Sequence, residues 1–128
     1  MITYENYLNE NDSITWEECR SIYMDIVGQI QKKKDSKAEA LFKEMQQRAI
    51  TYGTIRANWF NLSFGERAEA DADRTRKHDL FIKAKSDLAT YMYEQKMDID
   101  WEDRLGTQRK RIGDFACYMV FLISLQER

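Results

Sequence analysis

Acidic residues at helical spacing are the first feature of this sequence that could do chemistry. Glu66 and Glu69 lie three residues apart, so on a helix their carboxylates would point to one place and could share a Mg²⁺ ion. A nucleotide hydrolase built on this plan needs a second acidic pair on the following helix. The acid expected three residues after Glu94 is missing, and Asp100 with Asp103 has the pattern of a helix start. A Mg²⁺-dependent all-α nucleotide hydrolase is therefore an alternative for which the sequence supplies only one of the two acidic pairs.

The residue types that act as nucleophiles or soft metal ligands are few and isolated. His78 is the single histidine, and the residue three positions before it is Thr75, where a di-iron bundle requires glutamate. Cys19 and Cys117 have no metal-binding spacing, and we expect both to be reduced thiols buried in the core. The sequence contains no G-x-S-x-G elbow and no glycine-rich phosphate loop. We therefore expect no catalytic residue, no metal and no cofactor.

Charged residues at positions where the helical pattern expects apolar ones form the most specific candidate site. Arg56 interrupts the apolar stripe of its helix, and Asp114 shares a helical face with Cys117. An isolated buried charge is costly, so such groups should be paired or open to solvent. One interpretation is a polar pocket in which Arg56 or Arg74 meets Asp114 beside His78. The other, which we favour, is an ion-pair network that fixes the register of the helices.

A short cationic cluster precedes Asp114 in the chain. Arg104, Arg109, Lys110 and Arg111 would be spread around a helix as a collar, and acidic neighbours offset part of their charge. The whole chain carries a formal charge of −2 and has no basic domain. Binding of phosphate or nucleic acid through this basic collar is a further alternative, and a disfavoured one.

Capping patterns and apolar periodicity predict the elements that position these side chains. Thr15-x-x-Glu18 is a capping box that begins the first helix, which ends in the basic run 32–34. Ser36-x-x-Glu39 has the same pattern and predicts the start of a second helix. Apolar residues repeat every three or four positions behind both starts, as they do in amphipathic helices.

A third helix is predicted from about residue 66 to residue 96. Ser63-x-x-Glu66, with Gly65 inside it, marks the turn and restart that precede this helix. Its second half carries a regular apolar face, whereas its first half contains little besides alanines and charged residues. The pattern leaves open whether this helix is continuous.

The fourth helix is predicted to begin at a cap formed by Asp98 or Asp100. The apolar spacing passes through Gly106 and Gly113, so we predict one continuous helix although each glycine costs about 1 kcal/mol relative to alanine. These glycines would also permit close approach of a neighbouring helix. After residue 114 the helix is apolar nearly all round, and such a surface must be covered on several sides. Five of its residues are therefore candidates for a subunit interface: Phe115, Tyr118, Met119, Phe121 and Leu122.

Composition sets the outer limits of these predictions. The chain has 128 residues, of which 43% are hydrophobic and 33% charged, with five glycines and no proline. This is the size of one domain, and the absence of proline argues against turn-rich β architectures. We predict an all-α antiparallel bundle of four main helices with short connections over residues 14–128, preceded by an arm at residues 1–13. The longest mainly apolar run, residues 115–125, is about half of what spans a bilayer, so we expect a cytoplasmic protein with no membrane partner.

Two segments together resemble a known group of proteins. The sequences D-R-T-R-K-H-D (73–79) and R-K-R-I-G-D-F-A-C-Y (109–118) resemble a family of small, uncharacterised helical proteins from Gram-positive bacteria, a domain of unknown function. The resemblance covers most of residues 50–128. It implies an all-α bundle in a bacterial cytoplasm and transfers no catalytic residue.

The sequence taken as a whole favours a non-enzymatic interaction or regulatory protein. Its partner would be a second copy, giving a homodimer, or another protein. The grounds are the apolar stretch after residue 114 and the lack of a complete catalytic constellation.

Overall fold

The computed structural model describes residues 13–126, without the side chains of Phe60 and residues 123–126, and every regular element in this range is helical. The prediction of an all-α fold with four main helices is confirmed. The described range contains four long helices, one short helix and a 3₁₀ turn. In chain order they are α2 (Trp16–Lys33), α3 (Ser36–Asn58), η1 (Trp59–Asn61), α4 (Phe64–Glu94), α5 (Asp100–Leu105) and α6 (Arg109–Gln126).

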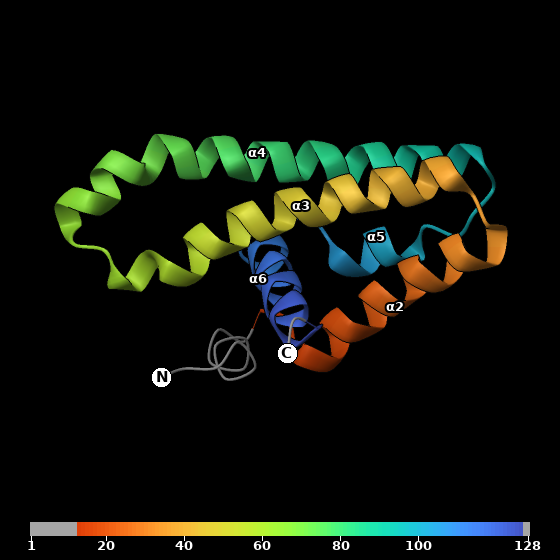
Figure 1. Ribbon diagram of the computed structural model, residues 1–128, viewed down its shortest axis with the longest axis horizontal. Helices are drawn as coiled ribbons and strands as arrows, with labels where there is room; N and C mark the ends of the chain where they lie inside the picture. Colours follow the sequence, from red (N-terminus) through yellow and green to blue (C-terminus); the bar gives the residue numbers. More distant parts are fainter. Residues whose placement is uncertain (1–12, 127–128) are drawn as a thin grey trace.

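The two longest helices, α3 and α4, form an antiparallel hairpin that runs the length of the molecule (Figure 1). The helix α6 crosses α3 steeply near its middle, and α2 diverges from α3 below the hairpin with α5 beside it (Figure 1). The end of the hairpin where α3 and α4 connect extends well past α6 (Figure 1). The helix α4 is continuous from Phe64 to Glu94, which answers the question that the sequence pattern left open.

Local capping accounts for where two of these helices begin. The Thr15 hydroxyl accepts from the amide of Glu18 at 3.1 Å, and the Glu18 carboxylate accepts from the amide of Thr15 at 3.3 Å. Ser63 and Glu66 form the same reciprocal pair at the start of α4. Two of the three predicted capping boxes, those at Thr15 and Ser63, are therefore confirmed. Each satisfies two amides that would otherwise lack a partner.

The helix α3 begins differently from the prediction. Its N-cap is Asp35, whose carboxylate accepts from the amides of Lys37 and Ala38 at 3.0 and 3.1 Å, so Ser36 is already the first helical residue. The hydroxyl of Tyr91 on α4 also donates to Asp35 at 2.7 Å, and this bond is the main reason that the pKa of Asp35 is lowered. Asp35 is itself a favoured N-cap residue, and the bond from Tyr91 also connects this cap to α4.

The predicted fourth helix is two helices, which corrects the prediction of a continuous one. Gly106 closes α5 with φ +77°, in the left-handed region that favours glycine, and α6 begins three residues later. The predicted cap is corrected in part: Ile99 holds the N-cap position without a side-chain bond, whereas the Asp98 carboxylate accepts from the amide of Asp100 at 2.8 Å. The apolar periodicity continues across this break, because Leu105 before it and Ile112 after it are both buried.

Contact between α3 and α6 depends on a glycine that periodicity does not single out. A Cβ built on Gly53 would lie 2.7 Å from the carbonyl oxygen of Ala116 and 2.8 Å from Cγ2 of Val120. The two helix backbones therefore come closer here than a side chain would permit. The core around them is apolar and includes the fully buried Trp101 and Phe115. No helix in residues 13–126 has the length and apolar character needed to span a membrane.

The close approach at Gly53 predicts that Gly53→Ala destabilises the fold although alanine is the better helix former. The added methyl would meet backbone atoms that can move only if α6 moves, and overpacking of this kind costs about 1–3 kcal/mol. Gly28→Ala is the matched control, since Gly28 lies inside α2 with no atom within 4 Å of the new methyl. Gly28→Ala should raise the free energy of unfolding by up to about 1 kcal/mol. Urea unfolding of both variants measures the difference, and equal effects would contradict the close packing of α3 on α6.

Candidate functional site

A buried carboxylate on α6 is the centre of the candidate site. Asp114 is fully buried, and Arg56 of α3 reaches it with Nη2 3.1 Å and Nε 3.3 Å from Oδ1. The Arg56 side chain keeps 19% of its surface exposed, so the ion pair lies at the edge of the core. The structure thus brings together the two residues that interrupt the apolar pattern of their helices.

The other oxygen of Asp114 is bonded to the segment that leads into α2. The hydroxyl of Ser13 donates to Oδ2 of Asp114. Both carboxylate oxygens therefore have partners, which is what a buried charge requires. Ser13 is the last residue of the predicted arm, and residues 1–12 of that arm lie outside the described residues.

Arg56 reaches Asp114 by lying across Gly113. A Cβ on Gly113 would stand 2.6 Å from Nε of Arg56, so any larger residue would displace the guanidinium. Nη2 of Arg56 also donates to the carbonyl oxygen of Lys110 at 3.4 Å. Gly113 thus provides the close approach predicted for it, to a side chain of the neighbouring helix, whereas Gly106 serves as a turn.

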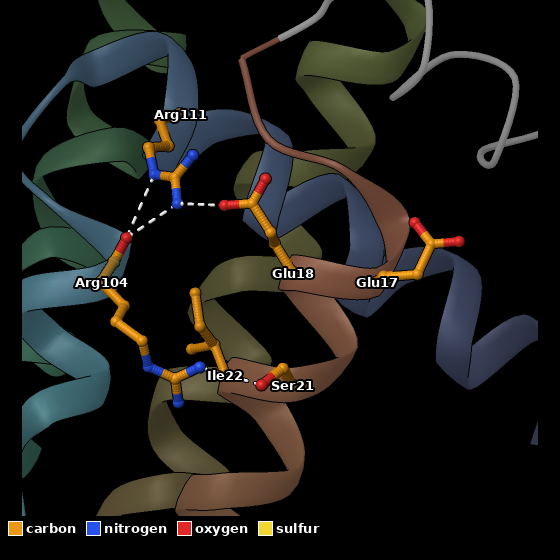
Figure 2. Close-up of a pocket in the computed structure, with 6 residues that line it drawn as sticks. All are labelled: Glu17, Glu18, Ser21, Ile22, Arg104 and Arg111. Atoms are coloured by element: carbon orange, nitrogen blue, oxygen red, sulfur yellow. Dashed lines mark hydrogen bonds and ion pairs between the residues drawn. The ribbon is translucent and has the colours of Figure 1, made fainter.

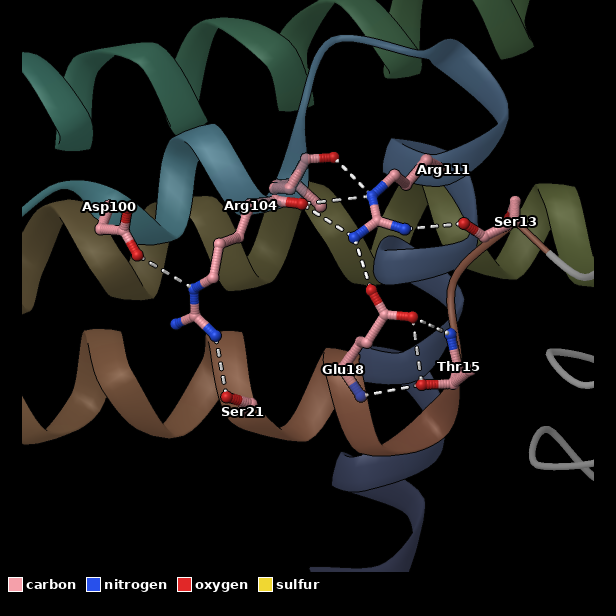
Figure 3. A network of polar contacts seen from close by, with 8 residues as sticks. Ser13, Thr15, Glu18, Ser21, Asp100, Arg104 and Arg111 are labelled. Carbon is pink, nitrogen blue, oxygen red and sulfur yellow. Dashed lines mark hydrogen bonds and ion pairs between the residues drawn. The ribbon is translucent and has the colours of Figure 1, made fainter.

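Arg111 connects the start of α6 to three further segments: the residue before Ile14, the first turn of α2 and the end of α5 (Figure 3). Its Nη2 lies 2.8 Å from the carboxylate of Glu18, and its Nη1 donates to the carbonyl of Ser13 at 2.7 Å. Its Nε and Nη2 donate to the last carbonyls of α5, those of Leu105 at 3.0 Å and Arg104 at 2.8 Å. These carbonyls lack helical partners because α5 ends there, so Arg111 acts as the C-terminal cap of α5.

A cleft of about 340 Å³ lies beside this arginine, between α2 and the connection from α5 to α6 (Figure 2). Its polar walls are bonded to one another: Nη1 of Arg104 donates to Ser21 at 2.9 Å, and Nη2 lies 3.1 Å from Asp25. The cleft is therefore walled by an ion-pair network, and we assign it no substrate. Its lining consists of Glu17, Glu18, Ser21, Ile22, Arg104 and Arg111.

The remaining two residues of the predicted polar pocket have other partners. The guanidinium of Arg74 lies over the Trp59 ring, 4.1 Å from its centroid, and pairs with an acid of its own helix at 2.8 Å. His78 packs edge-on against Tyr52, with ring centroids 5.2 Å apart. Within the described part of the chain, neither side chain hydrogen-bonds to Asp114. The geometry therefore fits the ion-pair interpretation of Arg56 and Asp114 and does not form the four-residue pocket.

The two cysteines are buried thiols, as predicted. Burial, and after it the nearby charge of Asp114, raises the pKa of the Cys19 thiol far above its usual value. Cys117 donates to the carbonyl of Gly53 at 3.7 Å. A thiol that stays protonated is a poor nucleophile, so Cys19 is a structural residue.

The carboxylates required by the hydrolase alternative do not converge. Glu66 lies at the beginning of α4, where its bond to the amide of Ser63 lowers its pKa. Asp100 is the first residue of α5, which lies below the other half of α4 (Figure 1). Between residues 13 and 126, no group of three or more histidine, cysteine, aspartate or glutamate residues is placed to hold a metal ion. The described residues therefore do not supply the two facing acidic pairs that this alternative needs.

The four cations of the basic collar fall into two groups, one paired and one exposed. Arg104 and Arg111 are bonded to carboxylates of α2, whereas Arg109 and Lys110 are exposed at the first turn of α6. The four cations therefore do not form one surface that could bind a phosphate backbone.

The candidate interface residues on α6 are largely used within one chain, which corrects that prediction. Phe115, Tyr118 and Met119 are at most 2% exposed and belong to the core. Phe121 and Leu122 are partly exposed, and Phe121 lies edge-on to Trp16 with ring centroids 4.8 Å apart. Phe115, Tyr118 and Met119 are therefore not available to a partner, whereas for Phe121 and Leu122 an interface stays a prediction.

Sequence reasoning missed two features that bear on function. Lys85 of α4 is buried at 6% exposure and lies 3.4 Å from Glu102 of α5. Its position, four residues after Phe81 and three before Leu88 on the apolar stripe, is the signal that could have identified it.

The second missed feature is a hollow of about 570 Å³ between α2 and α3, which we call the α2–α3 groove. Tyr23 and Phe42 lie side by side in its lining as a tilted ring pair with centroids 5.6 Å apart, and the Tyr23 hydroxyl accepts from Gln46 at 2.8 Å. Because its residues come from two helices, the periodicity of neither helix reveals it. It is lined by Tyr23, Val27, Ile30, Gln31, Lys34, Ser36, Glu39, Phe42, Lys43 and Gln46.

Comparison with protein-family models, curated proteins and solved structures finds no match to this chain. The arguments about function therefore rest on the residues and their geometry.

The buried ion pair predicts that Arg56→Met lowers the free energy of unfolding by about 3–5 kcal/mol, because it leaves Asp114 charged and without its cationic partner. Arg48→Met is the matched control: Arg48 pairs with Glu44 at 2.9 Å on the surface of the same helix, and loss of that pair should cost less than about 1 kcal/mol. Adding Asp114→Asn to Arg56→Met should restore part of the stability by removing the unpaired charge. Chemical denaturation of the three variants tests this, and equal losses for Arg56→Met and Arg48→Met would contradict it.

The Glu18–Arg111 pair predicts a specific contribution to stability at neutral pH. The hydrogen bond from Arg111 lowers the pKa of Glu18 below its ordinary value of 4.5, so the folded state favours the charged carboxylate. This contribution is present above pH 4.5 and is lost as the pH falls through the lowered pKa. Glu18→Gln keeps the capping box but removes the charge, so its stability deficit relative to the native chain should shrink on acidification.

Thermal unfolding over a pH series measures this deficit. Glu17→Gln is the control, since it removes the same charge from the same turn of α2 without loss of the ion pair to Arg111, so the comparison isolates the Glu18–Arg111 pair. A Glu18→Gln deficit that does not change with pH would show that the pair adds no charge-dependent stability.

Proposed function

We propose that this chain is a non-enzymatic interaction or regulatory protein that self-associates or binds a protein partner. The observation that carries the proposal is the α2–α3 groove, an apolar hollow rimmed by polar groups on the surface of a fully helical molecule. Grooves between helices with an apolar floor and a polar rim commonly receive a helix or loop of another protein.

The state of the reactive residue types supports the same proposal. Asp114, Glu18 and Glu66 each serve a structural contact, with Arg56, Arg111 and a helix start respectively. A catalytic site normally contains a titratable group that faces a cavity and is free to exchange a proton. In the two described hollows, the carboxylates and cations are bonded to one another or lie on the rim.

Exposed apolar side chains offer further contact area. Outside the core, Met24 is 54%, Tyr93 69% and Phe64 91% exposed. Single exposed apolar residues are ordinary on protein surfaces. Phe64 is unusual because it is almost fully exposed and lies at a projecting end of the molecule, where a partner can reach it (Figure 1).

Native mass spectrometry of the full chain, sprayed without chelator over a range of concentrations, tests the proposal. We expect dimers or larger assemblies whose share grows with concentration, and no retained small-molecule mass. Monomers at every concentration would reject self-association. A retained metal or nucleotide mass that disappears from a chelator-treated or extensively dialysed control would reject the assignment of a non-enzymatic protein.

A further inference from the structure

The two ends of the long axis differ in shape. At one end α3 connects to α4 through η1, and at the other α2 connects to α3 beside the α2–α3 groove (Figure 1). The first end projects and carries an exposed aromatic ring, whereas the second is hollowed and has an apolar floor. A projection and a hollow at opposite ends of one molecule are the requirement for a head-to-tail contact between copies.

The projecting end, residues 59–65, which we call the tip, presents Phe64 as its most prominent described side chain. Phe64 is the first residue of α4 and is 91% exposed. Leu62 beside it is partly exposed, whereas Trp59 is covered on one face by the guanidinium of Arg74. The capping box of Ser63 fixes the backbone on which Phe64 stands, so the ring is held on a defined turn.

The α2–α3 groove is suited to an aromatic ring. Tyr23 and Phe42 form a tilted aromatic pair in its floor with Val27 beside them, and ring-to-ring contacts of this kind add to the gain from apolar burial. The hydrogen bond from Gln46 fixes the Tyr23 hydroxyl, so the floor is formed before a ligand arrives. Its volume of about 570 Å³ can accommodate a phenyl ring together with neighbouring atoms of a tip.

The two ends also carry opposite charge. Residues 31–43, at the groove, contain five lysines and two acidic residues, whereas the first turns of α4, next to the tip, carry Glu66 and Glu69 with one arginine. Further along α4, Asp71 and Asp73 are already paired with arginines of the same helix at 2.8 and 2.5 Å, so the acidic excess beside the tip is small. Of the two acids near the groove, Asp35 is bonded to Tyr91, and Glu39 pairs with Lys43 at 3.3 Å on an exposed surface. Exposed opposite charges of this size orient and accelerate an encounter more than they strengthen it.

We propose that the tip of one copy inserts Phe64 into the α2–α3 groove of a second copy. This inference rests on the proposed function and gives its self-association a site and a direction. The contact is heterologous, because it joins different surfaces of the two copies, so each dimer still has one open tip and one open groove. A contact confined to one loop and one groove is smaller than a standard interface, so the association should be weak and reversible.

Sedimentation velocity of the full chain, with two single variants and their mixture, tests this arrangement. Phe64→Asp removes the inserting ring at a position where it contributes little to the core, and Val27→Glu places a charge in the groove floor that repels the acidic tip. The native chain should form assemblies that grow with concentration and weaken in high salt. Each variant alone should associate about tenfold or more weakly, because a ring is no longer buried.

Mixing the two variants gives the decisive result. Phe64→Asp retains a native groove and Val27→Glu retains a native tip, so the mixture should form one-to-one heterodimers and stop there. A symmetric contact between two tips, or between two grooves, cannot be restored in this way. Native chain that associates while the mixture stays monomeric would overturn the tip–groove contact.

Matched controls separate this contact from general surface hydrophobicity. Tyr93→Asp and Met24→Glu change exposed apolar residues outside the tip and the groove lining, and neither should alter association. Lys43→Glu, on an exposed side chain of the groove rim, should weaken association even if Val27→Glu disturbs folding. Association that every one of these variants leaves intact would retain the proposed function and reject this site, whereas a native chain that stays monomeric at all concentrations would reject self-association altogether.

Discussion

The burial of one carboxylate determines how the helices of this protein meet. Asp114 has no exposed surface, and a buried charge without partners would cost more than most single contacts contribute. Its partners come from distant parts of the chain, the hydroxyl of Ser13 before α2 and the guanidinium of Arg56 on α3. The fold satisfies Asp114 only when α6, α3 and the start of α2 lie in one arrangement. The pair thus specifies geometry more than it adds stability, which is the usual effect of a buried ion pair.

Two other features hold α6 in this arrangement. Arg111 completes the carbonyls at the end of α5 and binds Glu18 at the start of α2, so the first turn of α6 connects three chain segments. Further along, Gly53 lets the backbones of α3 and α6 come into direct contact. The hydrogen bonds and ion pair of Arg111 hold the first turn of α6, and close backbone packing holds its middle. In this position α6 buries Phe115 and its apolar neighbours within a single chain.

This internal use of α6 removes Phe115, Tyr118 and Met119 from any partner surface. Arg56, Asp114, Glu18 and Arg111 hold helices together, and most of the described hydrophobic stretch of α6 is core. The α2–α3 groove and the projecting Phe64 remain as surfaces built from two helices or from a turn. Their opposite charges follow from the lysines at the end of α2 and the acids in the first turns of α4, where charges also suit the ends of helices.

The sequence by itself determined the helices and the two charges that do not fit them. The capping boxes at Thr15 and Ser63, and the misplaced Arg56 and Asp114, are readable because they depend on residues within a turn or two of each other. Only the tertiary structure decided that Asp35 also binds α4, that Arg56 rather than Arg74 meets Asp114, and that most of the apolar face of α6 is buried within one chain. Each of these depends on contacts between segments far apart in the sequence, as when Tyr91 meets Asp35 or Arg56 meets Asp114. Local periodicity does not record such contacts, because the same spacing of apolar residues fits a core helix and an interface helix equally well.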